Sequence, residues 1–332
     1  MVSSRTARAR PEELLESQLG SYRVTSLLQT GGMGNVFLGE HVFLQRSAAI
    51  KTARADAPVP YRRLQRRLLV EARCLAAVDH PNVVTVHDFG LSDGGVAFLA
   101  MDLLDGKSLD VILDQEGPLQ VPAALHIARE TARGLAAFHV KSIVCADVKP
   151  DNLMIVSGPL VGRPLERRPW VKLIDLGAAQ PIRESNLGFR QAIRFGTSWY
   201  MSPEAVLGFA LDERADVYSL ATLIFEMIVG QVPFRLADDQ EVMEQQLMAP
   251  VPLLSEVTSE VKPSSLLERL VADCLSKAPD DRPSSMYELL DRLDEADLQW
   301  RKAHGNKAVP AGMPSSKARL QYPGAASLGR KQ

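Results

Sequence analysis

The chain has 332 residues, of which 46% are hydrophobic and 23% are charged, as in a folded globular protein of one large domain or two lobes. A net charge of −2 gives no reason to expect a nucleic-acid partner. The longest apolar run, residues 217–230, contains Glu226 and is too short to span a bilayer, so it predicts a buried helix.

The N-terminal sequence and the spacing of the cysteines predict a cytoplasmic protein. The arginines near the N-terminus have no apolar stretch behind them, so no secretory signal is expected. The three cysteines lie far apart, without the spacing of a structural zinc site. They are Cys74, Cys145 and Cys274.

Strands are expected in the first third of the chain. Residues 1–20 are a polar, basic lead-in, and the alternation over 22–51 predicts a hairpin and a third strand. Residues 61–77 show helical spacing, and residues 83–103 predict two more strands around a turn at 92–95. Four arginines are expected on the exposed face of that helix: Arg62, Arg63, Arg66 and Arg67.

After Gly106 the pattern becomes mainly helical. The stretch 157–169, rich in proline, glycine and arginine, predicts a surface loop between two short strands. Strands followed by helices predict an α+β, bilobal fold, with a β-rich small lobe (21–104) and an α-helical large lobe (105–297). Helices are expected over 120–141, 212–230, 238–248, 264–275 and 284–297.

The C-terminal tail, residues 298–332, is expected to be disordered. Its part from 301 onward carries seven Lys or Arg and no acidic residue. A basic tail could dock on an acidic partner, but the pattern favours a solvated extension with no dedicated partner.

Glycines mark the turn of the first predicted hairpin, at Gly31, Gly32 and Gly34. Glycine lets the backbone approach a phosphate closely without a Cβ clash. A plain hairpin turn explains these glycines equally well. No Gly-Lys-Ser/Thr follows them, which excludes a Walker A loop.

Lys51 and Glu71 are more informative together than either residue is alone. Lys51 ends an apolar strand, where a lysine usually only extends its charged end to solvent, and Glu71 lies among apolar residues of the following helix. A buried Lys–Glu pair behind the glycine turn would hold the ammonium group toward a phosphate.

The strongest set of polar residues is Asp147, Lys149, Asn152 and Asp175. Phosphoryl transfer needs a carboxylate to orient the attacking hydroxyl, hard oxygen ligands for Mg²⁺ and a cation near the transferred phosphate. The alternative, that each residue merely makes a turn, weakens as the number of matching positions in this order grows.

With these residues the chain resembles the eukaryotic-type (Hanks-type) Ser/Thr protein kinases, particularly the bacterial ones, over residues 21–297. The resemblance rests on the glycine turn, A-A-I-K ending at Lys51, Glu71, H-P-N-V-V from His80, C-A-D-V-K-P-D-N from Cys145, D-L-G from Asp175, G-T-S-W-Y-M-S-P-E from Gly196, D-E-R-A-D-V-Y-S-L from Asp212 and D-R-P from Asp281.

The resemblance implies ATP and Mg²⁺, which Mn²⁺ could replace, as cofactors and a Ser or Thr of a protein as acceptor. Asp147 would be the catalytic base, Lys149 would neutralise the γ-phosphate, and Asn152 and Asp175 would bind the metal. Met101 would be the gatekeeper, and the backbone of 102–104 would bond adenine. The implied nucleotide-binding residues are Gly31, Gly32, Gly34, Val36, Ala49, Lys51, Glu71, Met101, Asp102, Leu104 and Leu153.

Three further residues have implied structural roles. Asp216 would hold the backbone of the catalytic loop, and Glu204 with Arg282 would form the ion pair that anchors the activation segment. Lys149, together with the Thr197 after Gly196, matches the Ser/Thr-specific pattern of the family.

The chain departs from the family at four positions. Gln29 replaces the first loop glycine, Leu176 replaces a phenylalanine, and Cys145-Ala146 replace His-Arg. We expect Cys145 to pack as a small hydrophobic side chain and not to serve as a reactive thiol. Since Ala146 removes the arginine that receives an activation-segment phosphate, we expect activity without that phosphorylation.

Two other functions remain open from the sequence. A pseudokinase would bind nucleotide and act as a scaffold or docking module, and Gln29, Cys145 and Ala146 favour it slightly. A small-molecule phosphotransferase shares part of the catalytic loop, but residues 196–204 and Arg282 favour a protein substrate. Relatives form back-to-back dimers of the small lobes, although nothing in this sequence specifies one.

Overall fold

The structure is a computed structural model that describes residues 10–31, 34–54, 57, 59–156, 170–181, 198–236, 238–259, 261–262 and 265–305. Several predicted features lie outside these residues. They are Gly32, the loop 157–169, Ser185, Gly196, Thr197 and the tail from residue 306.

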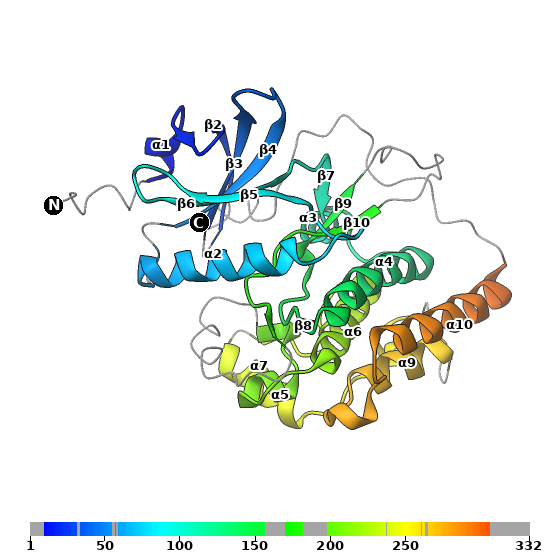
Figure 1. Cartoon of the computed structure of the whole chain (residues 1–332). Helices are drawn as coiled ribbons and strands as arrows, with labels where there is room; N and C mark the ends of the chain where they lie inside the picture. Colours follow the sequence, from blue (N-terminus) through cyan, green and yellow to red (C-terminus); the bar gives the residue numbers. More distant parts are fainter. Residues whose placement is uncertain are drawn as a thin grey trace, which may run out of the picture.

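The small lobe is a six-stranded antiparallel sheet with the order β1-β2-β3-β4-β6-β5 and helix α2 packed beneath it (Figure 1). The predicted hairpin, third strand, helix and later strand pair are all present. The bounds are β1 Gln18–Leu19, β2 Tyr22–Thr30, β3 Gly34–His41, β4 Ser47–Ala53, α2 Tyr61–Ala76, β5 Val86–Leu91 and β6 Ala97–Asp102.

The polar, basic lead-in contains regular elements from residue 11 onward. Helix α1 (Pro11–Leu14) and strand β1 precede the predicted start of the lobe. Leu14 and Leu19 are buried with Tyr22, Val24 and other residues on one face of the sheet, which explains why these short elements form without any periodic signal.

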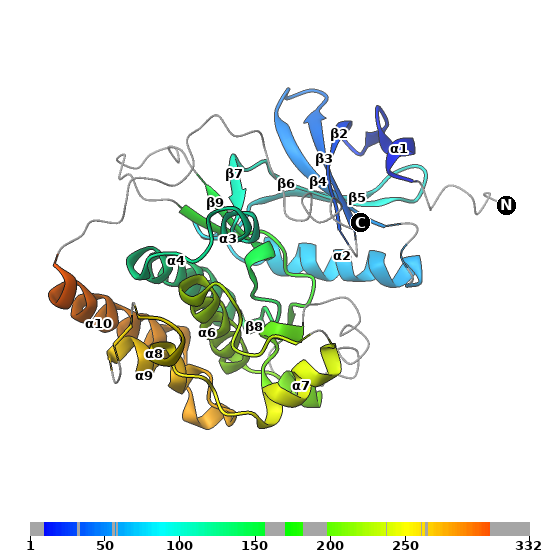
Figure 2. The ribbon, with the colours of Figure 1, turned by 180° about the vertical axis from the view of Figure 1, so that it is seen from behind.

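The large lobe is helical and lies below α2 in both views (Figures 1 and 2). The predicted helices are present, together with shorter elements that were not expected, such as α3. The helices are α3 Leu109–Glu116, α4 Val121–Val140, α5 Pro203–Leu207, α6 Glu213–Val229, α7 Asp239–Met248, α8 Leu254–Val257, α9 Leu266–Cys274 and α10 Met286–His304.

Short strands and 3₁₀ turns complete the rest of the structure. The two strands expected to flank the loop 157–169 are β9 and β10, which pair with each other, and β9 also pairs with β7. The bounds are β7 Gly106–Ser108, β8 Ile143–Val144, η1 Pro150–Asn152, β9 Leu153–Val156, β10 Trp170–Leu173, β11 Gln180–Pro181, η3 Ser198–Tyr200 and η4 Pro279–Asp281.

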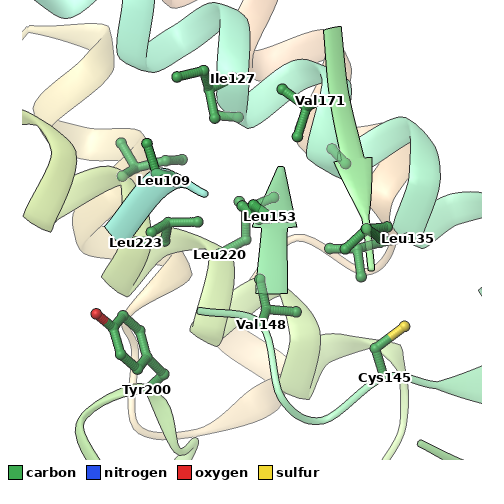
Figure 3. Packing of buried hydrophobic residues seen from close by; sticks show 14 of the residues in the cluster. Leu109, Ile127, Leu135, Cys145, Val148, Leu153, Val171, Tyr200, Leu220 and Leu223 are labelled. Atoms are coloured by element: carbon green, nitrogen blue, oxygen red, sulfur yellow. The ribbon is translucent and has the colours of Figure 1, made fainter. Parts of the chain in front are cut away.

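Helix α6 is the central helix of the large lobe, as its apolar sequence predicts. Most of its residues are buried, and it contacts α4, α9 and α10. Figure 3 shows Leu220 and Leu223 of α6 near Leu153 of β9 and Val148 of the catalytic loop. Among the described residues, no helix is long and apolar enough to cross a membrane.

The predicted boundary at residue 297 falls inside α10, which continues to His304. Asp297 binds Arg129 of α4 at 3.0 Å and Arg301 of its own helix at 3.0 Å, and Trp300 stacks on His304 with ring centroids 4.5 Å apart. Positive charge in the last helical turn is also favourable for the helix dipole. The first basic residues counted with the tail therefore belong to a helix end.

The four arginines of α2 do not all face solvent. Arg62 and Arg66 are exposed, whereas Arg63 and Arg67 are only partly exposed. The prediction that all four are exposed is wrong for these two, and Arg67 lines a cavity together with Lys51 and Glu71.

Candidate active site

The glycine turn joins β2 to β3 at the edge of the cleft. The N–H of Gly31 donates to the carbonyl oxygen of Gly34 at 2.9 Å, which closes the turn. A Cβ at Gly34 would lie 2.4 Å from the carbonyl oxygen of Thr52, a backbone atom of the neighbouring strand β4. Glycine is therefore required at position 34 by packing against β4, before any ligand is considered.

The predicted adenine-binding residues gather in one apolar cluster. Ala49 on β4 is the register partner of Met101 on β6, and both are buried with Leu104 and Leu153, with Val36 packed against the cluster. They come from both lobes and belong to the same apolar cluster, so a planar base bound among them would have the apolar surroundings that such ligands need.

Asp102 follows the predicted gatekeeper at the start of the segment that connects the lobes. Its N–H donates to the carbonyl oxygen of Thr85 at 3.0 Å, and its carboxylate lies 2.9 Å from His87 Nε2. The N–H of Asp102 is thus already engaged, so backbone donation to a base is left to residues 103 and 104 of the predicted hinge.

Lys51 binds two carboxylates that come from different elements. Its Nζ lies 2.7 Å from Oε1 of Glu71 on α2 and 2.7 Å from Oδ2 of Asp175. The predicted Lys51–Glu71 pair is therefore present, and its side chains are only 12% and 3% exposed. This pair joins α2 to the sheet, and Asp175 connects both to the metal-binding turn.

The charges of this group are set by burial and by one another. Burial alone would lower the pKa of Lys51, but the charges of Asp175 and Glu71 raise it above its usual value. Burial alone would raise the pKa of Asp175, but the charge of Lys51 outweighs burial and lowers this pKa below its usual value. Lys51 and Asp175 are therefore charged at neutral pH.

The catalytic loop holds Asp147, Lys149 and Asn152 in mutual contact. Lys149 Nζ lies 2.9 Å from Oδ1 of Asp147, and Asn152 Nδ2 donates to Oδ2 of Asp147 at 3.0 Å and to its backbone oxygen at 2.7 Å. These bonds fix the Asp147 carboxylate in one orientation. A carboxylate held in this way can accept a proton from a hydroxyl placed beside it.

The chemistry of the donor set fits Mg²⁺. The Nδ2 of Asn152 is bound to Asp147, so the oxygen Oδ1 is the atom that could ligate a cation. The N–H of Ile174 donates to the carbonyl oxygen of Asn152 at 3.0 Å, and the N–H of Gly177 donates to Oδ1 of Asp175 at 2.9 Å. Mg²⁺ is commonly bound by one or two such oxygens together with substrate phosphates.

Within the described residues, no group of three or more His, Cys, Asp or Glu side chains is arranged to hold a metal ion without further ligands. The pair Asn152 and Asp175 would therefore need phosphate oxygens to complete the coordination of Mg²⁺. When bound, the ion would offset negative charge on those phosphates.

Asp216 on α6 holds the start of the catalytic loop, as the sequence predicts. Its Oδ2 accepts the N–H of Cys145 at 2.9 Å and its Oδ1 accepts the N–H of Ala146 at 2.7 Å. His139 Nε2 on α4 lies 2.7 Å from the same carboxylate, a contact that the sequence did not indicate. Ala146 has a φ of 56°, which this pair of hydrogen bonds stabilises.

Cys145 packs into the core. Its side chain is 1% exposed and lies in the same cluster as Leu135 and Val148 (Figure 3). Burial, with the nearby charge of Asp216, raises the pKa of the thiol well above its usual value. The side chain therefore acts as a small hydrophobic residue, as predicted, and Leu176 is likewise buried at 2% exposure.

We expect no thiol of the native protein to react with 5,5′-dithiobis(2-nitrobenzoate) at pH 8. Cys74, Cys145 and Cys274 are all buried and free, and burial raises the pKa of each. All three should react once guanidinium unfolds the chain. A fast-reacting thiol in the native protein that disappears in Cys145→Ala would instead mean that Cys145 is exposed and reactive.

Glu204 and Arg282 form the predicted ion pair. Two guanidinium nitrogens of Arg282 donate to the two carboxylate oxygens of Glu204 at 2.8 Å each. Arg282 also donates to the carbonyl oxygens of Ser276, Lys277 and Arg214, and its guanidinium lies 4.9 Å from the ring centroid of Tyr218. This arginine joins α5, α6 and the segment before α10.

Arg67 is a residue of the cleft that the sequence analysis did not assign. It lines a cavity with Gly34, Lys51, Glu71 and Gly177, among other residues. The available signal was its position one helical turn before Glu71, which places both on one face of α2.

The chain belongs to the protein kinase family. The family model described as protein kinase domain matches residues 22–292. It thus covers the sheet, the cleft and the helical lobe.

Curated relatives carry the same family name. Serine/threonine-protein kinase pkn2 of Myxococcus xanthus is 36% identical over 299 residues, which cover 89% of this chain and 35% of that protein. Pkn1 of Myxococcus xanthus is 31% identical, covering 91% of this chain and 42% of its own length. PknH of Mycobacterium tuberculosis is 32% identical over 283 residues, covering 84% of this chain and 42% of its own length. The chain thus spans only about a third to a half of the length of these relatives.

Proposed function

We propose that this protein is an active, ATP- and Mg²⁺-dependent kinase that transfers the γ-phosphate to Ser or Thr residues of protein substrates. The observation that carries the proposal is the complete set of contacts among Lys51, Glu71, Asp175 and the catalytic loop. A nucleotide phosphate bound by Lys51 and the glycine turn would lie toward Asp147 and Lys149. Family membership and the names of the relatives support the same function.

Asp147 would orient the acceptor hydroxyl and take its proton as the oxygen attacks the γ-phosphate. Lys149, which is bound to Asp147, would offset the charge that develops on the transferred group. The bound metal ion would supply further charge neutralisation. Because little of the work is covalent chemistry, most of the rate should come from positioning and electrostatic stabilisation.

Transfer of labelled γ-phosphate from ATP to a protein substrate or to the chain itself tests this function. We expect labelling by the wild type and almost none by Lys51→Met, because the substitution removes the ammonium group that binds Glu71 and Asp175. Labelling that persists in Lys51→Met would come from a contaminating kinase. Tight ATP binding without any labelling by the wild type would instead support the pseudokinase, which Gln29, Cys145 and Ala146 favour.

We also propose that activity does not require a phosphate on the activation segment. Ala146 stands where an arginine would receive such a phosphate, and residues 178–193 contain only Ser185 as a hydroxyl acceptor. Ser185→Ala should therefore keep its kcat/KM within about twofold of the wild type, because position 146 offers no arginine for a phosphate on Ser185 to bind. A large loss of activity in Ser185→Ala that Ser185→Glu restores would contradict the proposal.

A further inference from the structure

Lys277 lies between helix α9 and the turn η4, where its side chain reaches the last turn of α7. The side chain is partly buried. Its Nζ donates to the carbonyl oxygen of Gln245 at 3.2 Å and lies 4.2 Å from the ring centroid of Phe234. An ammonium group has three N–H donors, so one carbonyl oxygen and one ring face compensate its charge only in part.

Three other lysines are largely buried, but each differs from Lys277 in its partner or in its access to solvent. Lys51 and Lys149 form ion pairs with carboxylates at 2.7 Å and 2.9 Å. Lys172 is only 5% exposed and donates to the carbonyl oxygen of Val83. Among the residues that the structure describes, no carboxylate pairs with Lys277, and its side chain remains partly exposed.

Within the described part of the chain, the charge that acts on the Lys277 amine is that of a second cation. Arg282 donates to the backbone oxygen of Lys277 at 3.1 Å, which brings the two cationic residues into the same part of the lobe. Burial, followed by the charge of Arg282, lowers the pKa of Lys277 to about 8. Burial and a neighbouring cation both favour the neutral amine, and the neutral amine is the nucleophilic form of lysine.

The amine also lies beside a helix that holds part of the activation segment. Gln246 of α7 donates from Nε2 to the carbonyl oxygen of Trp199 at 2.7 Å. At the start of α7, the carboxylate of Asp239 accepts the hydroxyl of Ser198 at 2.7 Å. A change of charge at Lys277 therefore falls next to the helix that binds this segment at two points.

We propose that Lys277 is an acylation site, at which the side-chain amine reacts with the activated acyl group of an acyl phosphate or an acyl thioester. The lone pair of the neutral amine forms a C–N bond to the carbonyl carbon. The C–O bond to phosphate, or the C–S bond to the thiol, breaks with its electron pair, and the proton of the amine passes to the leaving group or to water. The product is an uncharged amide, which removes a cation from beside Arg282 and keeps one N–H for the oxygen of Gln245.

The test is acetylation of the whole chain by acetyl phosphate at about pH 7.5, followed at each lysine by quantitative mass spectrometry. We expect the initial rate at Lys277 to be roughly tenfold higher than at Lys141, Lys262 and Lys302, which are exposed. The larger neutral fraction of the amine favours Lys277, and the weaker nucleophilicity of a less basic amine offsets part of this gain. The site does not depend on the proposed kinase function, because neither ATP nor a protein substrate is present.

Two controls show whether the folded surroundings cause the reactivity. In guanidinium, which unfolds the chain, Lys277 should react at the same rate as Lys302. In the folded protein, the rate at Lys277 should level off above about pH 8, whereas the rate at a free lysine peptide keeps rising to about pH 10. Repeating the reaction with acetyl coenzyme A separates the two donors, since preferential reaction with only one of them assigns the site to that class.

Three outcomes would overturn the acylation site. The first is equal rates at Lys277 and at the exposed lysines of the folded protein, with both donors. The second is a fast reaction at Lys277 that persists unchanged in guanidinium, which would make it a property of the local sequence. The third is a rate at Lys277 that follows the pH dependence of the free lysine peptide.

Discussion

Asp147→Asn should lower kcat for phosphate transfer by roughly 10²–10⁴-fold, the usual contribution of general base catalysis. Asparagine nearly matches the shape of aspartate, so the contacts of Asn152 with the loop backbone should survive. It cannot accept a proton, and it gives Lys149 a neutral partner where Lys149 now lies 2.9 Å from Oδ1 of Asp147. The loss should therefore appear in kcat, with little change in the affinity for ATP.

Single-turnover transfer and ATP binding, measured on the same preparations, check this prediction. Asp114→Asn is the matched control, because Asp114 is exposed on α3 and the change in charge is the same. If Asp147→Asn and Asp114→Asn transfer phosphate at similar rates, Asp147 is not the base. A parallel loss of ATP binding in Asp147→Asn would indicate instead that the loop has rearranged.

Arg282→Ala should lower the free energy of unfolding by about 3–5 kcal/mol, the cost of leaving one member of a buried ion pair without its partner. The side chain of Arg282 is fully buried, and that of Glu204 is 10% exposed. The substitution also removes the donors to the carbonyl oxygens of Ser276, Lys277 and Arg214. The effect should be among the largest of any single substitution in the helical lobe.

Denaturant unfolding of Arg282→Ala beside Arg10→Ala measures this effect. Arg10 pairs with Glu13 at 3.1 Å, but both side chains are at least half exposed, so its loss should cost far less than the loss of Arg282. The double variant Glu204→Gln/Arg282→Met should recover part of the stability, since it leaves no unpaired buried charge. Similar losses in Arg282→Ala and Arg10→Ala would show that the buried pair contributes little.

The sequence predicts this fold best where local patterns are long. The strands of the first hairpin alternate over many residues, and α4 and α6 have long apolar stretches, so their bounds match the structure within a few residues. Helix α1 and strand β1 are too short for any periodic signal. They form because Leu14 and Leu19 pack on the sheet, a contact that no local pattern contains.

For the site, too, residues that belong to sequence motifs could be predicted, whereas contacts between distant residues could not. Lys51, Glu71, Asp147, Asn152 and Asp175 could be assigned from their order in the chain, and the structure brings them together. The contact of His139 with Asp216 spans 77 residues and belongs to no local sequence pattern. The partial burial of Arg63 and Arg67 could not be predicted, because helical spacing shows that residues share a face but not what that face meets.

The buried carboxylate of Asp216 also couples local opening of the catalytic loop to unfolding of the large lobe. Its side chain is 0% exposed and holds two backbone N–H groups of the catalytic loop from the middle of the fold. Local opening of that loop would leave this charge without its donors in an apolar interior, which is costly. The loop should therefore open only when α6 does, so that Asp147 keeps its position during fluctuations that open the rest of the cleft.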